Sequence, residues 1–197
     1  MEFIKNEFID DEILLMYRCG SYAFGTSNEN SDEDYIVVLK NFKGMTHRNN
    51  GKKEYFIYGL RAWKGKMEFS DSYDEYNEIF NDEIMAFPDN LVYMSETIRA
   101  DVEKYISVFP SKIKIWCKKI YSYYDFFYSN NFIEKNMYHL IRIRSIVERY
   151  KVTGSFSLEL SNDVKEWIAK FKAAPDKKLY KNELKAALDY FKKEAEA

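Results

Sequence analysis

The sequence predicts an α+β fold in which a small mixed β-sheet is followed by a helical C-terminal half. Two short apolar runs, at residues 14–19 and 35–39, have the length and composition of buried strands. After residue 73 the spacing of apolar residues changes from about 2 to about 3.6, which is the period of an amphipathic helix. We therefore expect a core at residues 1–94 and a helical region packed on it at residues 95–197.

Composition and charge exclude several functional classes. The net charge of -2 gives the whole chain no positive field that would attract nucleic acid or an anionic membrane. No apolar run approaches the ~20 residues that cross a bilayer, and the N-terminus lacks the pattern of a signal peptide. Cys19 and Cys117 have no CxxC spacing, and His47 and His139 add no metal cluster. We expect a soluble cytoplasmic protein without membrane contact.

Turn-forming residues divide the N-terminal part into its elements. Residues 20–34 are rich in Gly, Ser, Asn and Asp and predict a turn, with one helical turn at residues 22–24. The polar, basic stretch at residues 41–53 predicts an exposed and mobile excursion. Residues 54–63 and 67–73 predict a hairpin that extends the sheet.

Proline, glycine and capping residues divide the C-terminal half into helices. Ser95 and Ser161 are suited to cap helix starts, Pro110 to begin a helix, and Gly154 to end one. The helix expected at residues 111–128 carries an aromatic stripe whose spacing is typical of packing between helices: Trp116, Ile120, Tyr123, Tyr124 and Phe127. The expected helices cover residues 76–87, 96–108, 111–128, 132–150 and 162–171, with a last helix in the tail.

The turn at residues 20–34 contains the residues that are best suited to bind a ligand or take part in a reaction. Gly20 permits a tight turn whose backbone N–H groups can approach an anion, and the Ser21 hydroxyl is a further donor for phosphate. Asp32 and Asp34 are two residues apart, so their carboxylates point the same way on an extended chain. Two negative charges held this close need a cation, and Mg²⁺ binds carboxylates together with phosphate oxygens. The combination predicts phosphoryl chemistry on a triphosphate.

Two segments resemble a known family. The stretch GSYAFGTSNENSDEDYIVV, with Gly25, Thr26, Ser31 and Tyr35, fits the form GSxAxGTxxxxSDxDY. It is similar to the signature of the nucleotidyltransferase superfamily, which includes DNA polymerase β, in the form found in predicted bacterial and phage members. Downstream, KNMYHLIRIRSIVERYKVTGSFSLEL resembles the helical segment of the same group. The two matches span about a quarter of the chain and are collinear with the family pattern.

The resemblance implies a nucleotidyltransferase core and its reaction. An acceptor hydroxyl would attack the α-phosphate of a nucleoside triphosphate such as ATP, and pyrophosphate would leave. Asp32 and Asp34 would hold Mg²⁺, or Mn²⁺ in its place, while Gly20 and Ser21 would hold the β and γ phosphates.

The superfamily adds a third carboxylate from a neighbouring strand. Our first choice is Asp71, which lies nine residues before Phe80 in the expected hairpin, in a spacing similar to that of the predicted group. Glu68 and Asp74 are the alternatives. Asp71 would complete the metal site with Asp32 and Asp34.

A helix in the C-terminal half offers donors to the nucleotide. Lys135, His139 and Arg142 fall at i, i+4 and i+7, so one helix face can present them to a triphosphate or an acceptor. A histidine among apolar helix residues is more often a core group, which is the competing interpretation of His139.

The acceptor and the partners stay open at this point. The acceptor is a protein hydroxyl, as for an AMP-transferring regulator or antitoxin, a nucleic-acid end, or a small molecule. The net charge of -2 disfavours a long nucleic-acid track. A second class of function is a catalytically silent nucleotide-binding or partner-binding module of the same fold, such as an antitoxin-like regulator. The high tyrosine content favours a homodimer or a partner protein.

Overall fold

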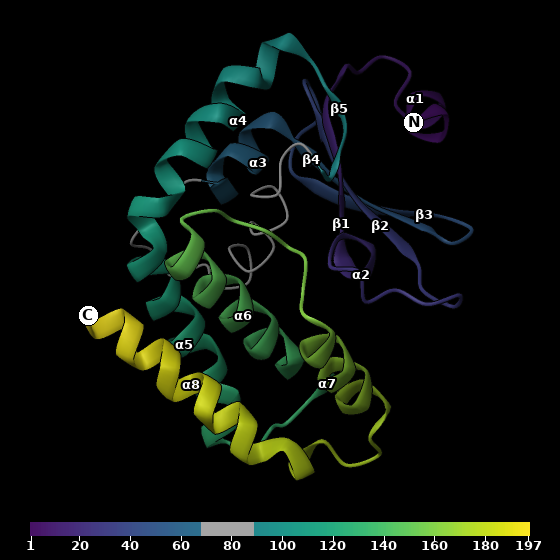
Figure 1. Ribbon diagram of the computed structural model, residues 1–197. Coiled ribbons are helices and arrows are strands. Elements are labelled where there is room, and N and C mark those ends of the chain that lie inside the picture. The colour runs from purple at the N-terminus through teal and green to yellow at the C-terminus, as the bar shows by residue number, and fades with distance from the viewer. Residues whose placement is uncertain (68–88) are drawn as a thin grey trace. The chain divides into compact units, whose positions relative to one another are not determined.

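The computed structural model describes residues 1–67 and 89–197 and confirms an α+β fold built on a five-stranded mixed sheet (Figure 1). The chain divides into two compact units, Met1–Phe109 and Pro110–Ala197. The helix expected to open the C-terminal region, α4 (Glu96–Val108), lies in the first unit. In the described part of the chain, no helix has both the length and the apolarity needed to cross a bilayer.

The sheet has the strand order β3-β4-β2-β1-β5. Its centre is the antiparallel pair of β1 (Ile13–Cys19) and β2 (Glu33–Leu39), which are the two apolar runs in the sequence. On one side β4 (Lys53–Gly59) runs parallel to β2, and on the other the short edge strand β5 (Leu91–Met94) runs antiparallel to β1. The mixed sheet predicted from the sequence is therefore confirmed.

The segment expected as an exposed excursion is in part a strand. β3 (Met45–Asn50) pairs antiparallel with β4, with His47 opposite Phe56. No residue of β3 is buried, so the strand is defined by backbone hydrogen bonds to β4 and not by an apolar face. An edge strand of this kind leaves no alternation of apolar and polar residues in the sequence.

The expected hairpin after β4 is wrong within the described residues, because α3 (Leu60–Met67) follows the strand directly. Trp63 and Met67 are buried and four residues apart, so they lie on one side of a helix and pack together onto the sheet. Burial of this face favoured a helix over a second strand. Residues 68–73 of the expected hairpin and the helix expected at residues 76–87 lie outside the described residues.

Both faces of the sheet are covered. Ile36 and Val38 of β2 belong to the cluster that includes residues of α3 and α4, whereas Val37 belongs to the cluster that includes Ile4 of α1 (Glu2–Glu7). Burial on both faces explains why the two central strands are continuous apolar runs. Figure 1 shows α3 and α4 together on one side of the strands.

The second unit is helical. Ser161 caps α7 by accepting a hydrogen bond from the Val164 N–H at 3.4 Å, and Gly154 ends α6 at a φ of 70°, as their positions predict. Three of the stripe residues of α5, Trp116, Ile120 and Tyr124, are buried, which confirms their core role. The α-helices are α5 (Ile113–Ser129), α6 (Tyr138–Thr153), α7 (Asn162–Ala173) and α8 (Lys181–Glu196), and the 3-10 turns are η2 (Phe109–Lys112), η3 (Lys135–Met137) and η4 (Lys177–Tyr180).

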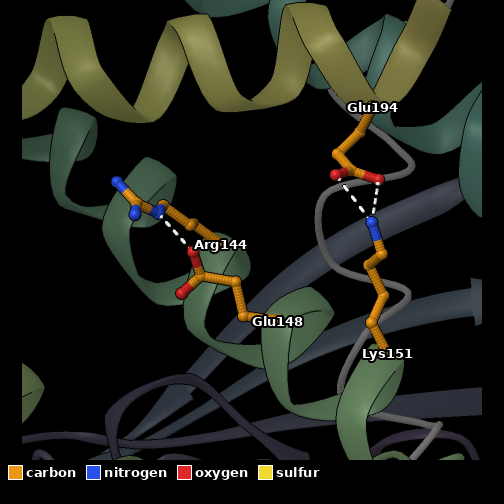
Figure 2. A network of polar contacts seen from close by, with 4 residues as sticks. All are labelled: Arg144, Glu148, Lys151 and Glu194. Carbon is orange, nitrogen blue, oxygen red and sulfur yellow. Dashed lines mark hydrogen bonds and ion pairs between the residues drawn. The ribbon is translucent and has the colours of Figure 1, made fainter. Parts of the chain in front are cut away.

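An ion pair joins two of these helices at their surface. Lys151 of α6 donates to both carboxylate oxygens of Glu194 of α8 at 2.8 Å (Figure 2). On α6 itself, Arg144 and Glu148 form an i, i+4 pair at 2.8 Å. Lys151 and Arg144 therefore have their charges matched by carboxylates where α6 meets α8.

Candidate functional site

The end of β1 and the start of β2 form a corner at which Gly20 meets Asp34. Cys19 pairs with Asp34 in the antiparallel ladder, so Gly20 follows directly beside the acid. Gly20 has a φ of +66°, and a Cβ built on it would lie 1.9 Å from Asp34 Oδ2. Only glycine combines this left-handed backbone with room for the carboxylate. The structure thus brings Asp34 against the glycine-serine corner.

Asp32 lies at the same end of β2. It is exposed and immediately precedes the strand, which begins at Glu33, whereas Asp34 is half-buried inside the strand. Asp34 shares the sheet face of Ile36 and Val38, which the alternation of a strand requires. The acid pair therefore consists of one carboxylate anchored in the sheet and one at its solvent edge.

The loop after Gly20 is braced by its own hydrogen bonds. Gly20 begins the short helix α2 (Gly20–Ala23), after which the Thr26 N–H donates to the Ser21 carbonyl at 2.9 Å. Gly25 turns the chain at a φ of 63° just before this bond. The Ser21 hydroxyl makes no hydrogen bond to any described residue, so it is free to meet a ligand. Gly25 and Thr26 support the loop.

The far end of the loop is hydrogen-bonded to Lys52, which directly precedes β4. The Glu33 N–H donates to the Lys52 carbonyl at 2.7 Å, and Lys52 Nζ donates to the Glu29 carbonyl at 2.6 Å. Inside the loop, the Asn28 N–H donates to Ser31 Oγ at 2.9 Å. These bonds set the entry of the chain into β2, and with it the positions of Asp32 and Asp34.

Glu54 is an acid that the sequence analysis missed. It is the register partner of Asp34 in the parallel pair β2 and β4, and partners in parallel strands point to the same face of a sheet. Its Oε2 lies 3.4 Å from Nε2 of His47, on the edge strand β3. Glu54 opens the apolar run of β4, but only the parallel register places it beside Asp34.

The described residues do not contain a complete three-ligand metal centre. No three His, Cys, Asp or Glu side chains within residues 1–67 and 89–197 come close enough to hold a metal ion. Asp71, Glu68 and Asp74, the candidates for the third carboxylate, lie outside the described residues. A Mg²⁺ site needs only one or two carboxylates from the protein, because substrate phosphates and waters complete the shell.

Tyr35 of the motif lies on the opposite face of the sheet from Asp34. Its hydroxyl donates to Glu33 at 2.5 Å, and burial raises the pKa of this phenol. The Arg18 guanidinium lies 6.0 Å from the centre of the Tyr35 ring and 5.7 Å from that of Tyr22. Tyr35 therefore helps to hold Glu33, the first residue of β2, from the face of the sheet opposite Asp34.

The three basic residues expected on one helix differ in their surroundings. Lys135 is exposed and belongs to η3, so it precedes α6, whereas His139 and Arg142 lie within α6. Arg142 is 1% exposed, and Nδ1 of His139 is shielded from solvent. Burial, with smaller contributions from Arg142 and Lys172, lowers the pKa of His139 well below its usual range. All three belong to the second unit, while the acid pair belongs to the first.

The fold and the corner together define the class of this chain: an α+β protein whose mixed sheet places Asp34 against Gly20 and Asp32 at the same end of β2. The chain is similar to a solved structure, a nucleotidyltransferase-like protein from Exiguobacterium sibiricum, over 99% of this chain and 73% of the other. The TM-score is 0.36 and the sequence identity 9%, a level of likeness that does not assign an activity. No protein-family model and no curated protein matches the sequence.

Proposed function

We propose that this chain is a metal-dependent nucleotidyltransferase, which moves a nucleoside monophosphate from a triphosphate to an acceptor hydroxyl and releases pyrophosphate. The observation that supports this proposal is the placement of the Asp34 carboxylate against Gly20, at the end of β2 where Asp32 also lies. A corner that can receive phosphate beside two carboxylates that can bind a cation is the minimal arrangement for this chemistry.

The residues of the corner have separate roles in the proposal. Asp32 and Asp34 hold the metal, and Ser21 uses its unengaged hydroxyl to bind a phosphate oxygen near Gly20. The bonds from Thr26 to Ser21 keep the turn in shape before substrate arrives. Bound Mg²⁺ supplies positive charge to the triphosphate and lowers the pKa of the attacking hydroxyl.

Glu54 joins Asp71, Glu68 and Asp74 as a candidate for the third carboxylate on the condition that its side chain turns from His47 towards Asp34, because no three such side chains of the described residues lie within reach of one metal ion. It lies on the strand next to Asp34 and on the same face of the sheet. In this structure its carboxylate is directed to His47, on the side away from β1. A Glu54→Gln variant that keeps its stability but loses turnover would assign the third position to Glu54, while full activity would leave it to the other three.

Pyrophosphate release tests the proposal directly. We expect release from at least one labelled triphosphate in the presence of Mg²⁺, and we expect Asp32→Asn and Asp34→Asn each to reduce it at least about 100-fold, as loss of a group that stabilises the transition state does. The matched control is Asp10→Asn, an exposed acid outside the corner. Equal loss in the control, or full activity in both corner variants, would contradict the assignment.

A second candidate function is a nucleotide-binding module without turnover. It is the alternative left by the open position of the third carboxylate, because Asp71, Glu68 and Asp74 lie outside the described residues. Thermal unfolding separates the two candidates from a mistaken site. Both predict that saturating MgATP or MgGTP raises the melting temperature. At a nucleotide concentration of 100 times Kd, the free energy of unfolding rises by about 2.7 kcal/mol. Stabilisation without pyrophosphate release supports the module, and no stabilisation by either nucleotide would refute both.

A further inference from the structure

The two units differ strongly in charge. Residues 110–197 contain 18 Lys and Arg against 11 Asp and Glu, a balance of +7, whereas residues 1–109 contain 12 against 21, a balance of -9. The value of -2 for the whole chain is the sum of these opposite balances. The expectation that net charge disfavours nucleic acid therefore does not apply to the helical unit, because electrostatic binding depends on the charge of the surface that makes contact.

Part of this charge lies on one side of α5 and α8. On α5 the residues follow Lys114 by 4, 7 and 14 positions, and on α8 they follow Lys181 by 4 and 11 positions. At 3.6 residues per turn, each set lies on one side of its helix. We call this surface the lysine-tyrosine face. It consists of Lys114, Lys118, Tyr121 and Tyr128 on α5 and Lys181, Lys185 and Lys192 on α8.

Contacts between the two helices join the two sets into one surface. The Lys181 ammonium lies 5.3 Å from the centre of the Tyr128 ring. Lys185 lies near both Tyr121 and Tyr128, which add to the effect of Asp189 in raising the pKa of its ammonium group. At the opposite end of α5, Cys117 lies near Glu194 at the end of α8, so the helices run antiparallel and side by side. Figure 1 shows the two helices adjacent in the second unit.

Most positive charges of the lysine-tyrosine face are not neutralised within the described chain. Lys114, Lys118 and Lys192 are exposed and form no ion pair with a described residue. Lys185 is paired with Asp189 at 2.6 Å, and the other acids on the face are Asp125 and Glu196, which makes three acids against five lysines in all. The seam between α6 and α8 differs, because Lys151 and Arg144 are matched by carboxylates there (Figure 2).

We propose that the lysine-tyrosine face of α5 and α8 binds a single-stranded nucleic acid. From residue 114 to 128 the face is roughly 21 Å long at 1.5 Å per residue, which is room for several nucleotides. Lysines there contact phosphates, and the half-buried rings of Tyr121 and Tyr128 offer surfaces on which bases stack. Tyrosine rings among the lysines favour nucleic acid over a purely anionic partner such as an acidic peptide or a lipid headgroup. The inference concerns binding by the second unit and does not rest on the proposed nucleotidyl transfer.

Fluorescence anisotropy with the full chain tests this proposal. The probes are fluorescein-labelled RNA and DNA strands of about 12 nucleotides, a length within the site sizes of known single-strand binders. They are titrated in EDTA without nucleotide, at several salt concentrations. We expect binding that weakens with salt, with a slope that falls by about 1.4 in Lys114→Gln/Lys118→Gln, at about 0.7 per phosphate contact. Binding of either strand supports the proposal, and the tighter one identifies the sugar.

Two variants give the result its specificity. Lys165→Gln/Lys193→Gln removes the same charge from positions outside the face and should keep the salt slope of the original chain. Tyr128→Leu should weaken binding about fivefold or more without changing the slope, because it removes stacking and not charge. Equal effects of the two lysine pairs, or no binding at 50 mM salt, would overturn the proposal.

Further experiments distinguish nucleic acid from other anionic partners, and strand binding from the proposed nucleotidyl transfer. Equal competition by poly-glutamate, or equal binding to vesicles of anionic lipid, would overturn the assignment to nucleic acid. Asp32→Asn/Asp34→Asn should bind the strands as the original chain does, because the corner belongs to the first unit. If that variant loses pyrophosphate release and keeps strand binding, both proposals stand. If release is absent from the original chain while strand binding persists, only the proposed transfer fails.

Discussion

Position 20 requires glycine for two reasons, which are its φ of +66° in the turn and the Asp34 carboxylate beside it. An L side chain in this backbone conformation costs about 1–2 kcal/mol, and here its Cβ would also displace Asp34. We expect Gly20→Ala to lower the melting temperature by several degrees, since about 1 kcal/mol shifts it by about 2–4 °C in a chain of this size. It should also remove the stabilisation by MgNTP, because Asp34 is moved from the corner.

Gly65→Ala is the matched control for this prediction. A Cβ at Gly65 would meet nothing within 4 Å, and Gly65 lies within α3, where alanine is the better helix former. We expect it to be neutral or stabilising and to keep the nucleotide response. A Gly20→Ala variant that retains full stability and full response to MgNTP would show that the carboxylate does not depend on the corner.

At the scale of the element, α6 contains a histidine that the fold keeps neutral. Burial first, then Arg142 and Lys172, lower the pKa of His139 well below its usual value near 6.5. The unfolded chain binds this proton below pH 6.5 and the folded chain does not, so stability falls as pH decreases from about 6.5 towards the folded pKa. Above pH 6.5 the residue contributes no pH dependence. We expect a loss of roughly 1 kcal/mol from this group between pH 7.5 and 5.5, at about 1.4 kcal/mol per pH unit.

Urea unfolding at the two pH values measures this effect. His139→Gln should remove about that much of the pH dependence, while His47→Gln, at the exposed edge strand β3, should keep it. The same dependence in all three chains would show that folding does not lower the pKa of His139. A neutral histidine at pH 7 can bind a ligand through a hydrogen bond but adds no charge for phosphate, so within the predicted trio the charges belong to Lys135 and Arg142.

At the scale of the whole molecule, each compact unit contains one of the two cysteines, and both are buried. Burial raises the pKa of Cys117 to about 12, so its thiol stays protonated at neutral pH. We expect neither thiol to react with a thiol reagent in native buffer, and each to report the opening of its own unit as denaturant increases.

Peptide mapping of the labelled chain by mass spectrometry distinguishes the two thiols. Ile4→Ala removes a fully buried side chain from the core of the first unit, at a cost of about 2–5 kcal/mol. It should therefore move the labelling midpoint of Cys19 further than that of Cys117. Identical shifts would show that the two units unfold as one cooperative body. Rapid labelling of Cys117 in native buffer would contradict its burial.

The structure agrees with the sequence analysis where the signal was local and differs where pairing between strands decides. Periodicity located β1, β2, α4 and the helices of the second unit, because an element that buries one face repeats its apolar residues at a fixed period. It missed β3, which has no buried residue, and it took α3 for a strand, because its apolar spacing was too short to separate the two. The acid pair and the corner could be recognised from their spacing alone, as a turn between two strands.

The sequence by itself determined the α+β class, the turn from Gly20 to Asp34, and the residue types that can meet phosphate and a divalent cation there. Only the tertiary structure decided that Asp34 lies against Gly20, that Glu54 shares its sheet face, and that Lys181 of α8 lies beside Tyr128 of α5. The physical reason is range. Turns and helix faces follow from neighbours a few positions apart, whereas strand register and helix contacts depend on residues distant in the chain, whose pairing is set by burial of the whole unit.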